Sequence, residues 1–178
     1  FLTHGHEGNM GATPDVLEQL PEVPVYGTKL TLEMVAKDLD RSIANKVKLI
    51  EIKPHIKLNF GKNSIFPISV THSIPDAVCY VLYTPDGAIV YTGDFVFDST
   101  MQGTYKTDIG KLAYVGKQGV LCLLCESFYA DRPGHTSPNN RVSDFIREVL
   151  NDTDDRIIAT VMPAHYYRIQ EIFNEVNN

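Results

Sequence analysis

The sequence lacks long apolar segments and is poor in cysteine. Its 178 residues contain no run of about 18 apolar residues, which a membrane helix needs, and no charged segment that leads into an apolar one at the start. We therefore expect neither a membrane span nor a signal peptide, and we expect the protein in the cytoplasm. Three cysteines, an odd number, do not form a set of pairs, so a disulfide framework is not expected.

Two of the cysteines, Cys122 and Cys125, lie three apart in the apolar run of residues 120–125. Residues three apart on a strand face opposite sides, so these two thiols are not expected to meet. The CxxC spacing also occurs in half of a zinc site or in a redox pair, but no second cysteine pair accompanies it here. We predict that both are buried core thiols.

An excess of positive charge is also missing. The formal net charge is −6, and the 16 lysines and arginines are spread without a dense cluster. This balance lacks the electrostatic signature of a nucleic-acid-binding protein, although a locally basic groove is compatible with an acidic total. With 43% hydrophobic residues the chain can bury a core, and its length suits one domain or one domain and the beginning of another.

Metal-ligating residue types occur at four places. His4 and His6 stand two apart in the segment THGHEGN, whose glycines favour a loop that brings both imidazoles onto one cation. His72 and Asp94 each follow a strand-like run, so both lie where a strand is expected to end. Three neutral imidazoles and one carboxylate are a ligand set that Zn²⁺ or Mn²⁺ accepts.

Six short motifs, in a fixed order, carry a family resemblance. They are THGHE at residues 3–7, THSIPD at 71–76, YTGDF at 91–95, GVLCLLCES at 119–127, DRIIAT at 155–160 and RIQ at 168–170. Together they resemble the ribonuclease J family, in the β-CASP group of the metallo-β-lactamase superfamily, and they cover nearly the whole chain. The resemblance implies a metal-dependent hydrolase that processes and degrades RNA, ribosomal RNA included, as an endonuclease and 5′-3′ exonuclease.

The resemblance also implies an α/β fold. Residues 1–136 are expected to form a metallo-β-lactamase domain with an α/β/β/α sandwich, and residues 137–178 the start of an inserted β-CASP α/β domain. Both ends of the chain fall short of the family's full fold, so each domain is expected to be partial. The proline, glycine, serine and asparagine residues at 133–140 mark the predicted boundary.

Periodicity and turn residues predict the individual elements. Helices are expected at residues 13–20, 28–42, 139–150 and 165–176, and strands at 23–26, 46–52, 65–71, 77–83, 88–90 and 156–161. His55 belongs to no motif and has no partner in one, so we predict an ordinary surface histidine there.

The first motif departs from the family pattern HxHxDH in its last two positions. Gly8 and Asn9 stand where the family has an aspartate and a histidine that hold a second metal. Glycine has no side-chain ligand, and an amide is a poor substitute for an imidazole. The resemblance therefore implies one ion at most, Zn²⁺ or Mn²⁺, held by the three histidines and the aspartate named above. Whether that ion is bound stays open at this point.

A second departure lies before the RIQ motif. The family usually has Ser-Asn there, in a loop that holds substrate phosphate, whereas this chain has PAHYY, in which Ala164 supplies no hydroxyl. His165 and Tyr167 are candidate contacts to RNA or phosphate, because aromatic faces stack on single-stranded bases; core packing is the alternative for the tyrosine. Glu126 matches the acidic residue that opens the β-CASP motifs. It is expected to hydrogen-bond a ligand histidine or the substrate, or else to act as a helix cap or ion-pair partner.

Two functions fit these observations. The first is a ribonuclease J-like protein whose own nuclease activity is weak because of Gly8 and Asn9. The second is a non-catalytic RNA-binding or assembly subunit that pairs with an active ribonuclease J paralogue. A hydrolase of small esters or thioesters is a third, which the THSIPD and RIQ motifs disfavour. The expected partners are RNA and either a second copy of the chain or that paralogue, and no membrane.

Overall fold

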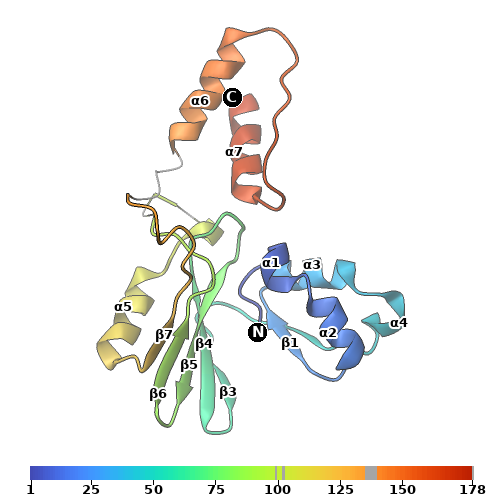
Figure 1. Cartoon of the computed structure of the whole chain (residues 1–178), viewed down its shortest axis with the longest axis vertical. Coiled ribbons are helices and arrows are strands. Elements are labelled where there is room, and N and C mark those ends of the chain that lie inside the picture. The colour runs from blue at the N-terminus through green and yellow to red at the C-terminus, as the bar shows by residue number, and fades with distance from the viewer. Residues whose placement is uncertain (99, 102, 135–139, 178) are drawn as a thin grey trace.

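The computed structural model describes residues 1–98, 100–101, 103–134 and 140–177. Within these residues, no helix is both long enough and apolar enough to cross a membrane. Two sheets form the centre of the larger part of the chain, and a pair of helices near the C-terminus stands apart from them (Figure 1). The predicted domain boundary between residues 136 and 137 lies outside the described residues.

The N-terminal part consists of helices and a small parallel sheet. Its elements are α1 (Glu7–Met10), α2 (Thr13–Gln19), β1 (Val25–Gly27), α3 (Lys29–Asp38), α4 (Arg41–Ala44) and β2 (Leu49–Glu51). Pro14 stands in the first turn of α2, where its missing N–H costs no hydrogen bond. The single helix predicted at 28–42 breaks at Leu39 and Asp40, which are extended. The Asp40 carboxylate caps α4 by accepting a hydrogen bond of 2.7 Å from the Ser42 N–H.

The larger sheet follows sequence order from its first strand to its last. Its strands are β3 (Leu58–Phe60), β4 (Asn63–Ser69), β5 (Val78–Thr84), β6 (Gly87–Tyr91) and β7 (Cys122–Leu124). Neighbours are antiparallel from β3 to β6, and β7 runs parallel to β6. The short helix η1 (Gly103–Tyr105) and α5 (Ile109–Gln118) lie on the crossover between β6 and β7. The turn residues Pro85 and Asp86 connect β5 and β6, which pair as an antiparallel hairpin.

Apolar clusters on both faces of β5 define the layers. Val78 packs with Ile52, just beyond β2, whereas Cys79 and Val81 pack with Val115 of α5. Successive side chains of a strand point to opposite faces, so the larger sheet is covered on both sides. A third cluster joins α2, α3 and α4 to the small sheet and consists of Leu2, Leu17, Val25, Leu32, Leu39, Ile43, Val47 and Leu49. The order helix, sheet, sheet, helix confirms the predicted α/β/β/α sandwich (Figure 1).

The last two helices, α6 (Asn140–Asp152) and α7 (Tyr166–Val176), lie side by side (Figure 1). Arg147 and Glu175 form an ion pair across them, with an Nε–Oε2 distance of 2.6 Å. The strand predicted at residues 156–161 is wrong, because that segment is exposed throughout and pairs with no strand among the described residues. A strand needs a neighbour for its N–H and C=O groups, which an apolar sequence alone does not provide.

Cys122 and Cys125 are exposed, so the prediction of buried core thiols is wrong for both. Cys122 is the first residue of β7, the last strand of the larger sheet as described, and every residue of β7 is exposed. An apolar run indicates a strand, but it does not say whether that strand lies in the middle of a sheet or at its edge. All three cysteines are free thiols, as expected without a disulfide framework.

Candidate metal centre

The four predicted metal ligands come together from three parts of the chain. His4 lies before α1, His6 directly precedes α1, His72 follows β4, and Asp94 follows β6. One ligand atom from each of the four residues lies within 4.8 Å of the others. The three imidazole rings meet nearly perpendicular to one another, with centroids 4.6 to 4.9 Å apart. The ends of two strands and of one helix thus place four donor groups around one point.

The spacing of these donor atoms fits a metal ion. Asp94 Oδ2 lies 3.5 Å from His4 Nε2 and 4.0 Å from His72 Nε2, and His72 Nε2 lies 2.9 Å from His6 Nδ1. Ligand atoms at about 2.0–2.2 Å from a tetrahedral ion are about 3.3–3.6 Å apart, so small shifts bring all four to one ion. Imidazole and carboxylate suit Zn²⁺ and Mn²⁺. That these residues bind metal stays a prediction.

Burial keeps two of the imidazoles neutral. It is the main cause that lowers the pKa of His4 to about 4; Asp94 opposes the shift and His6 adds to it. Burial also lowers the pKa of His72 to about 4, and the neighbouring His4 and His6 lower it further. Both rings are therefore neutral at pH 7, and each carries a single N–H. A neutral imidazole has a lone pair that it can donate to a metal ion.

Asn9 lies inside the cluster. Its side-chain nitrogen is 3.1 Å from His4 Nε2 and 3.4 Å from Asp94 Oδ2, so the amide donates to both. Because this nitrogen only donates, His4 Nε2 accepts and the ring proton is on Nδ1, which lies 3.0 Å from Thr3 Oγ1. The tautomer and ring orientation that a metal ligand needs are therefore already fixed by the protein.

Gly8 leaves open space at the first degenerate position. It lies in the single-turn helix α1, and a Cβ atom built on it meets no other atom within 4 Å. A Cβ atom therefore fits at this position without a clash. Position 8 thus offers no side-chain donor group, and its backbone leaves space for a Cβ atom.

Two features fix the backbone next to the ligands. Thr71, one residue before a ligand histidine, exchanges hydrogen bonds with Thr107: each N–H donates to the other residue's hydroxyl, at 2.7 and 3.1 Å, and the two hydroxyls are 2.9 Å apart. Gly93, one residue before Asp94, has a φ of +58°, and a Cβ there would lie 2.9 Å from Thr3. Glycine avoids both the left-handed strain and the clash.

Glu126 supports the turn that carries Asp94. Its Oε1 accepts a hydrogen bond of 2.8 Å from the Phe95 N–H, and its own N–H lies 3.4 Å from the Thr92 hydroxyl. Burial raises the pKa of the Glu126 carboxyl, the hydrogen bond from Phe95 lowers it, and the nearby Asp94 raises it. The observed partner of Glu126 is thus the backbone N–H of Phe95, the residue after Asp94. The Glu126 carboxylate therefore orients this turn and not one of the candidate ligand imidazoles.

His165 and Tyr167 lie at the start of α7. The Tyr167 N–H donates a hydrogen bond of 3.0 Å to the Ser73 carbonyl, which ties α7 to the segment that carries His72. His165 Nδ1 caps the helix by accepting a hydrogen bond of 3.2 Å from the Arg168 N–H. Burial is the main cause that lowers the pKa of His165. The segment that the resemblance assigns to phosphate binding is therefore joined to the cluster.

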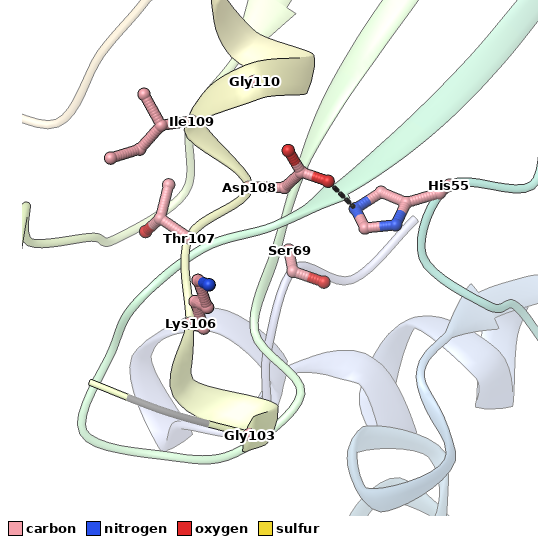
Figure 2. A pocket seen from close by; sticks show the side chains of 8 residues that line it. All are labelled: His55, Ser69, Gly103, Lys106, Thr107, Asp108, Ile109 and Gly110. Atoms are coloured by element: carbon pink, nitrogen blue, oxygen red, sulfur yellow. Dashed lines mark ion pairs between the residues drawn. The ribbon is translucent and has the colours of Figure 1, made fainter. Parts of the chain in front are cut away.

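A separate polar pocket lies at the start of α5 (Figure 2). His55 Nε2 is 3.5 Å from Asp108 Oδ2, and Asp108 Oδ1 accepts a hydrogen bond of 2.9 Å from the Lys111 N–H. His55 is a surface residue as predicted, but it has a partner, which no sequence signal indicates because the two lie far apart in the chain. The pocket has a volume of about 530 Å³ and is lined by His55, Ser69, Gly103, Lys106, Thr107, Asp108, Ile109 and Gly110.

Sequence comparison supplies the relationship to known proteins. No family model matches the chain. The chain is 37% identical over 175 residues to Ribonuclease J 2 of Staphylococcus aureus, which aligns 98% of the chain with 31% of that protein. The chain belongs to the ribonuclease J family. Ribonuclease J 2 of Staphylococcus saprophyticus is 35% identical over the same length, and this ribonuclease J chain thus spans 31% of the length of the relatives it matches.

Solved structures give the fold of this ribonuclease J chain independent support. A protein of unknown function from Enterococcus faecalis V583 covers 86% of the chain with a TM-score of 0.64, and the chain covers 40% of that protein. At 18% identity this likeness shows the fold alone. The metallo-beta-lactamase fold protein YhfI from Bacillus subtilis covers 55% of the chain, with 41% of YhfI covered, at a TM-score of 0.44 and 19% identity.

Proposed function

We propose that this ribonuclease J chain contributes the metal-binding part of a protein that acts on RNA in the cytoplasm, and that its own nuclease activity is weak. One observation carries the proposal: four donor atoms, from His4, His6, His72 and Asp94, lie within 4.8 Å of one another. RNA is the proposed substrate because the relatives are named ribonucleases. Residues 1–136 are proposed as a metallo-β-lactamase domain and the remainder as the start of a β-CASP domain.

The residues of the cluster have separate roles in this proposal. The histidines offer neutral nitrogen donors, and Asp94 offers one negative charge, so a divalent ion held there keeps a net positive charge toward an anionic phosphate. When bound, such an ion supplies Lewis acidity toward a phosphate oxygen and toward an attacking water. Glu126 holds the Asp94 turn through the Phe95 N–H, and so keeps the carboxylate directed at the cluster.

Weak activity is proposed because of Gly8 and Asn9. Gly8 has no carboxylate that could accept a proton from the attacking water, and the loss of such a base costs about 10²–10⁴-fold in rate. Asn9 offers an amide where an imidazole would hold a second ion. The Asn9 amide also donates to His4 Nε2 and Asp94 Oδ2, so it competes with a cation for the same lone pairs.

The contacts of Asn9 also favour a second candidate, a non-catalytic subunit. In that role the amide satisfies His4 and Asp94 without an ion, and the cluster serves to hold the start of the chain against the sheets. Such a subunit would bind RNA or pair with an active ribonuclease J paralogue, or with a second copy of itself. The two candidates differ in whether the protein itself breaks a phosphodiester bond.

Cleavage of a 5′-monophosphorylated single-stranded RNA in Mn²⁺ or Zn²⁺ separates the two candidates. The protein is expected to cut this RNA slowly, and His72→Ala, which removes one donor of the cluster, is expected to abolish the cleavage. Cleavage that survives in His72→Ala would contradict the proposed site. If neither protein cleaves while both still bind RNA, the non-catalytic subunit is the correct assignment.

A further inference from the structure

A cavity of about 560 Å³ opens beside the metal cluster. His72 and Glu126 contribute to one part of its wall, and Phe128, Tyr129 and Arg132 contribute to another. Because His72 also belongs to the cluster, the cavity and the proposed metal site share a wall. A ligand that fills the cavity therefore lies next to the donor atoms. Neither the sequence motifs nor the family relationship assigns a role to the second group of residues.

Phe128 and Tyr129 present large aromatic surfaces to solvent. Their side chains are 77% and 56% exposed, and their ring centroids are 4.3 Å apart with 50° between the ring planes. Tyr129 has a φ of +61°, which is unfavourable for a tyrosine. Hydrogen bonds of 3.0 Å from the Ala130 N–H to the Ser127 carbonyl and from the Arg132 N–H to the Tyr129 carbonyl hold this turn. A strained turn that keeps two aromatic rings exposed beside a cavity indicates a binding surface.

Arg132 adds a positive charge at the same rim. The carbon atom of its guanidinium lies 4.3 Å from the centroid of the Tyr129 ring. Among the residues that the structure describes, no carboxylate lies within ion-pair distance of Arg132. A guanidinium that is stacked in this way still presents N–H donors at its edge, in a geometry that matches a phosphate group. The rim therefore combines aromatic faces with one cation that has no anionic partner in this part of the chain.

We propose that Phe128, Tyr129 and Arg132 form a stacking subsite for a nucleotide of single-stranded RNA, adjacent to the metal cluster. The base lies against an exposed ring, and its phosphate receives hydrogen bonds from the guanidinium. Every base has an apolar face, so the subsite discriminates little between bases. A base within a duplex is already stacked, so the subsite favours unpaired RNA. This inference rests on the proposed action on RNA, which it makes more specific.

Binding of a fluorescently labelled single-stranded oligoribonucleotide, measured by anisotropy with a chelator present, tests the subsite. Phe128→Leu keeps the apolar volume but removes the aromatic face, and it is expected to weaken binding by about 5- to 150-fold. Phe128→Tyr keeps that face and is expected to bind as the unmodified protein does. Arg132→Ala is expected to reduce the slope of log affinity against log salt by about 0.7. Tyr114→Ala, at a tyrosine on α5 that is 58% exposed, is the matched control and should leave affinity unchanged.

Unchanged binding in both Phe128→Leu and Arg132→Ala overturns the subsite. An equal loss in Tyr114→Ala overturns it too, and so does a duplex RNA that binds as tightly as the single strand. Failure of the unmodified protein to bind RNA overturns it together with the choice of RNA as substrate. The cleavage assay reports separately on the nuclease. Cleavage together with binding that neither Phe128→Leu nor Arg132→Ala changes contradicts the subsite alone. Binding that these variants weaken, without cleavage by the unmodified protein, contradicts the nuclease alone.

Discussion

At the scale of single residues, the Asn9 side chain contacts two of the candidate ligand atoms, the nitrogen of His4 and the oxygen of Asp94. Its amide donates to His4 Nε2 at 3.1 Å and to Asp94 Oδ2 at 3.4 Å. Without a hydrogen-bond donor or a cation between them, these two acceptors would face each other with unpaired lone pairs. The protein therefore keeps the cluster satisfied in the absence of an ion, and an ion that binds must compete with the amide.

Replacement of both degenerate positions is expected to add a metal ion. In the double variant Gly8→Asp and Asn9→His, the number of Zn²⁺ or Mn²⁺ ions per chain should rise from one to two, because a Cβ atom at position 8 meets no neighbour within 4 Å and the variant supplies two donor groups. Isothermal titration calorimetry measures this number, with each single variant as a control expected to bind one ion. An unchanged number in the double variant would mean that more of the surroundings than these two residues had changed.

The metal-free protein is expected to lose stability as the pH falls from 6.5 to 4. The pKa values of His4 and His72 are about 4 in the folded protein, against 6.5 for an ordinary histidine such as one in the unfolded chain. Between pH 4 and pH 6.5 the unfolded chain therefore binds more protons than the folded protein, and protonation favours unfolding. Each histidine reduces the free energy of unfolding by at most about 3 kcal/mol across this range. Urea unfolding in chelator at pH 7 and pH 5 measures the loss. His72→Gln removes one titrating group and should flatten the dependence; an unchanged slope would contradict this cause.

At the scale of elements, the paired threonines connect the end of β4 to the segment before α5. Thr107→Val keeps the side-chain volume but leaves the buried Thr71 N–H without its acceptor. The free energy of unfolding is expected to fall by about 1–3 kcal/mol, and metal affinity should fall with it because Thr71 precedes His72. Urea denaturation and metal titration measure the two effects. Thr104→Val, at an exposed threonine, is the control, and equal stability of the two variants would contradict the prediction.

Strand-like apolar runs bounded by turn residues were sufficient to predict β4, β5 and β6, because both faces of this part of the sheet are covered and both carry apolar side chains. The same reasoning failed at residues 156–161, which have an apolar sequence but no strand partner among the described residues. It failed again for Cys122, which is exposed on the last strand of the larger sheet in the described part of the chain. Whether a strand is paired or covered depends on other segments, and a single sequence does not state it.

For the candidate site too, residues marked by motifs were predicted, whereas contacts that depend on side-chain geometry were not. The residues His4, His6, His72 and Asp94 were identified from motifs and from their places at strand ends, and the structure brings them together. The hydrogen bonds of Asn9, the Thr71–Thr107 pair and the His55–Asp108 pair were not predicted. Each of these joins segments by side-chain geometry, for which periodicity and spacing carry no signal.

At the scale of the whole molecule, the cluster links the start of the chain to the larger sheet. An ion that binds there is expected to stabilise the entire sandwich, by about 2.7 kcal/mol at a free concentration 100 times its Kd. Thermal unfolding with and without Zn²⁺ or Mn²⁺ measures the increase. His72→Ala should remove most of it, and an equal increase in that variant would place the ion elsewhere.

The attachment of the first residues to β5 has a consequence for folding kinetics. The Val78 N–H donates to the Thr3 carbonyl at 3.0 Å, and the Tyr80 hydroxyl donates to the Leu2 carbonyl at 2.6 Å. Contacts between segments so distant in sequence close large loops and form slowly. We therefore expect His4 to reach the other candidate ligands after β5 has paired with its neighbours. Metal uptake is then expected to be a late step of folding, and a stopped-flow record of metal binding would time it directly.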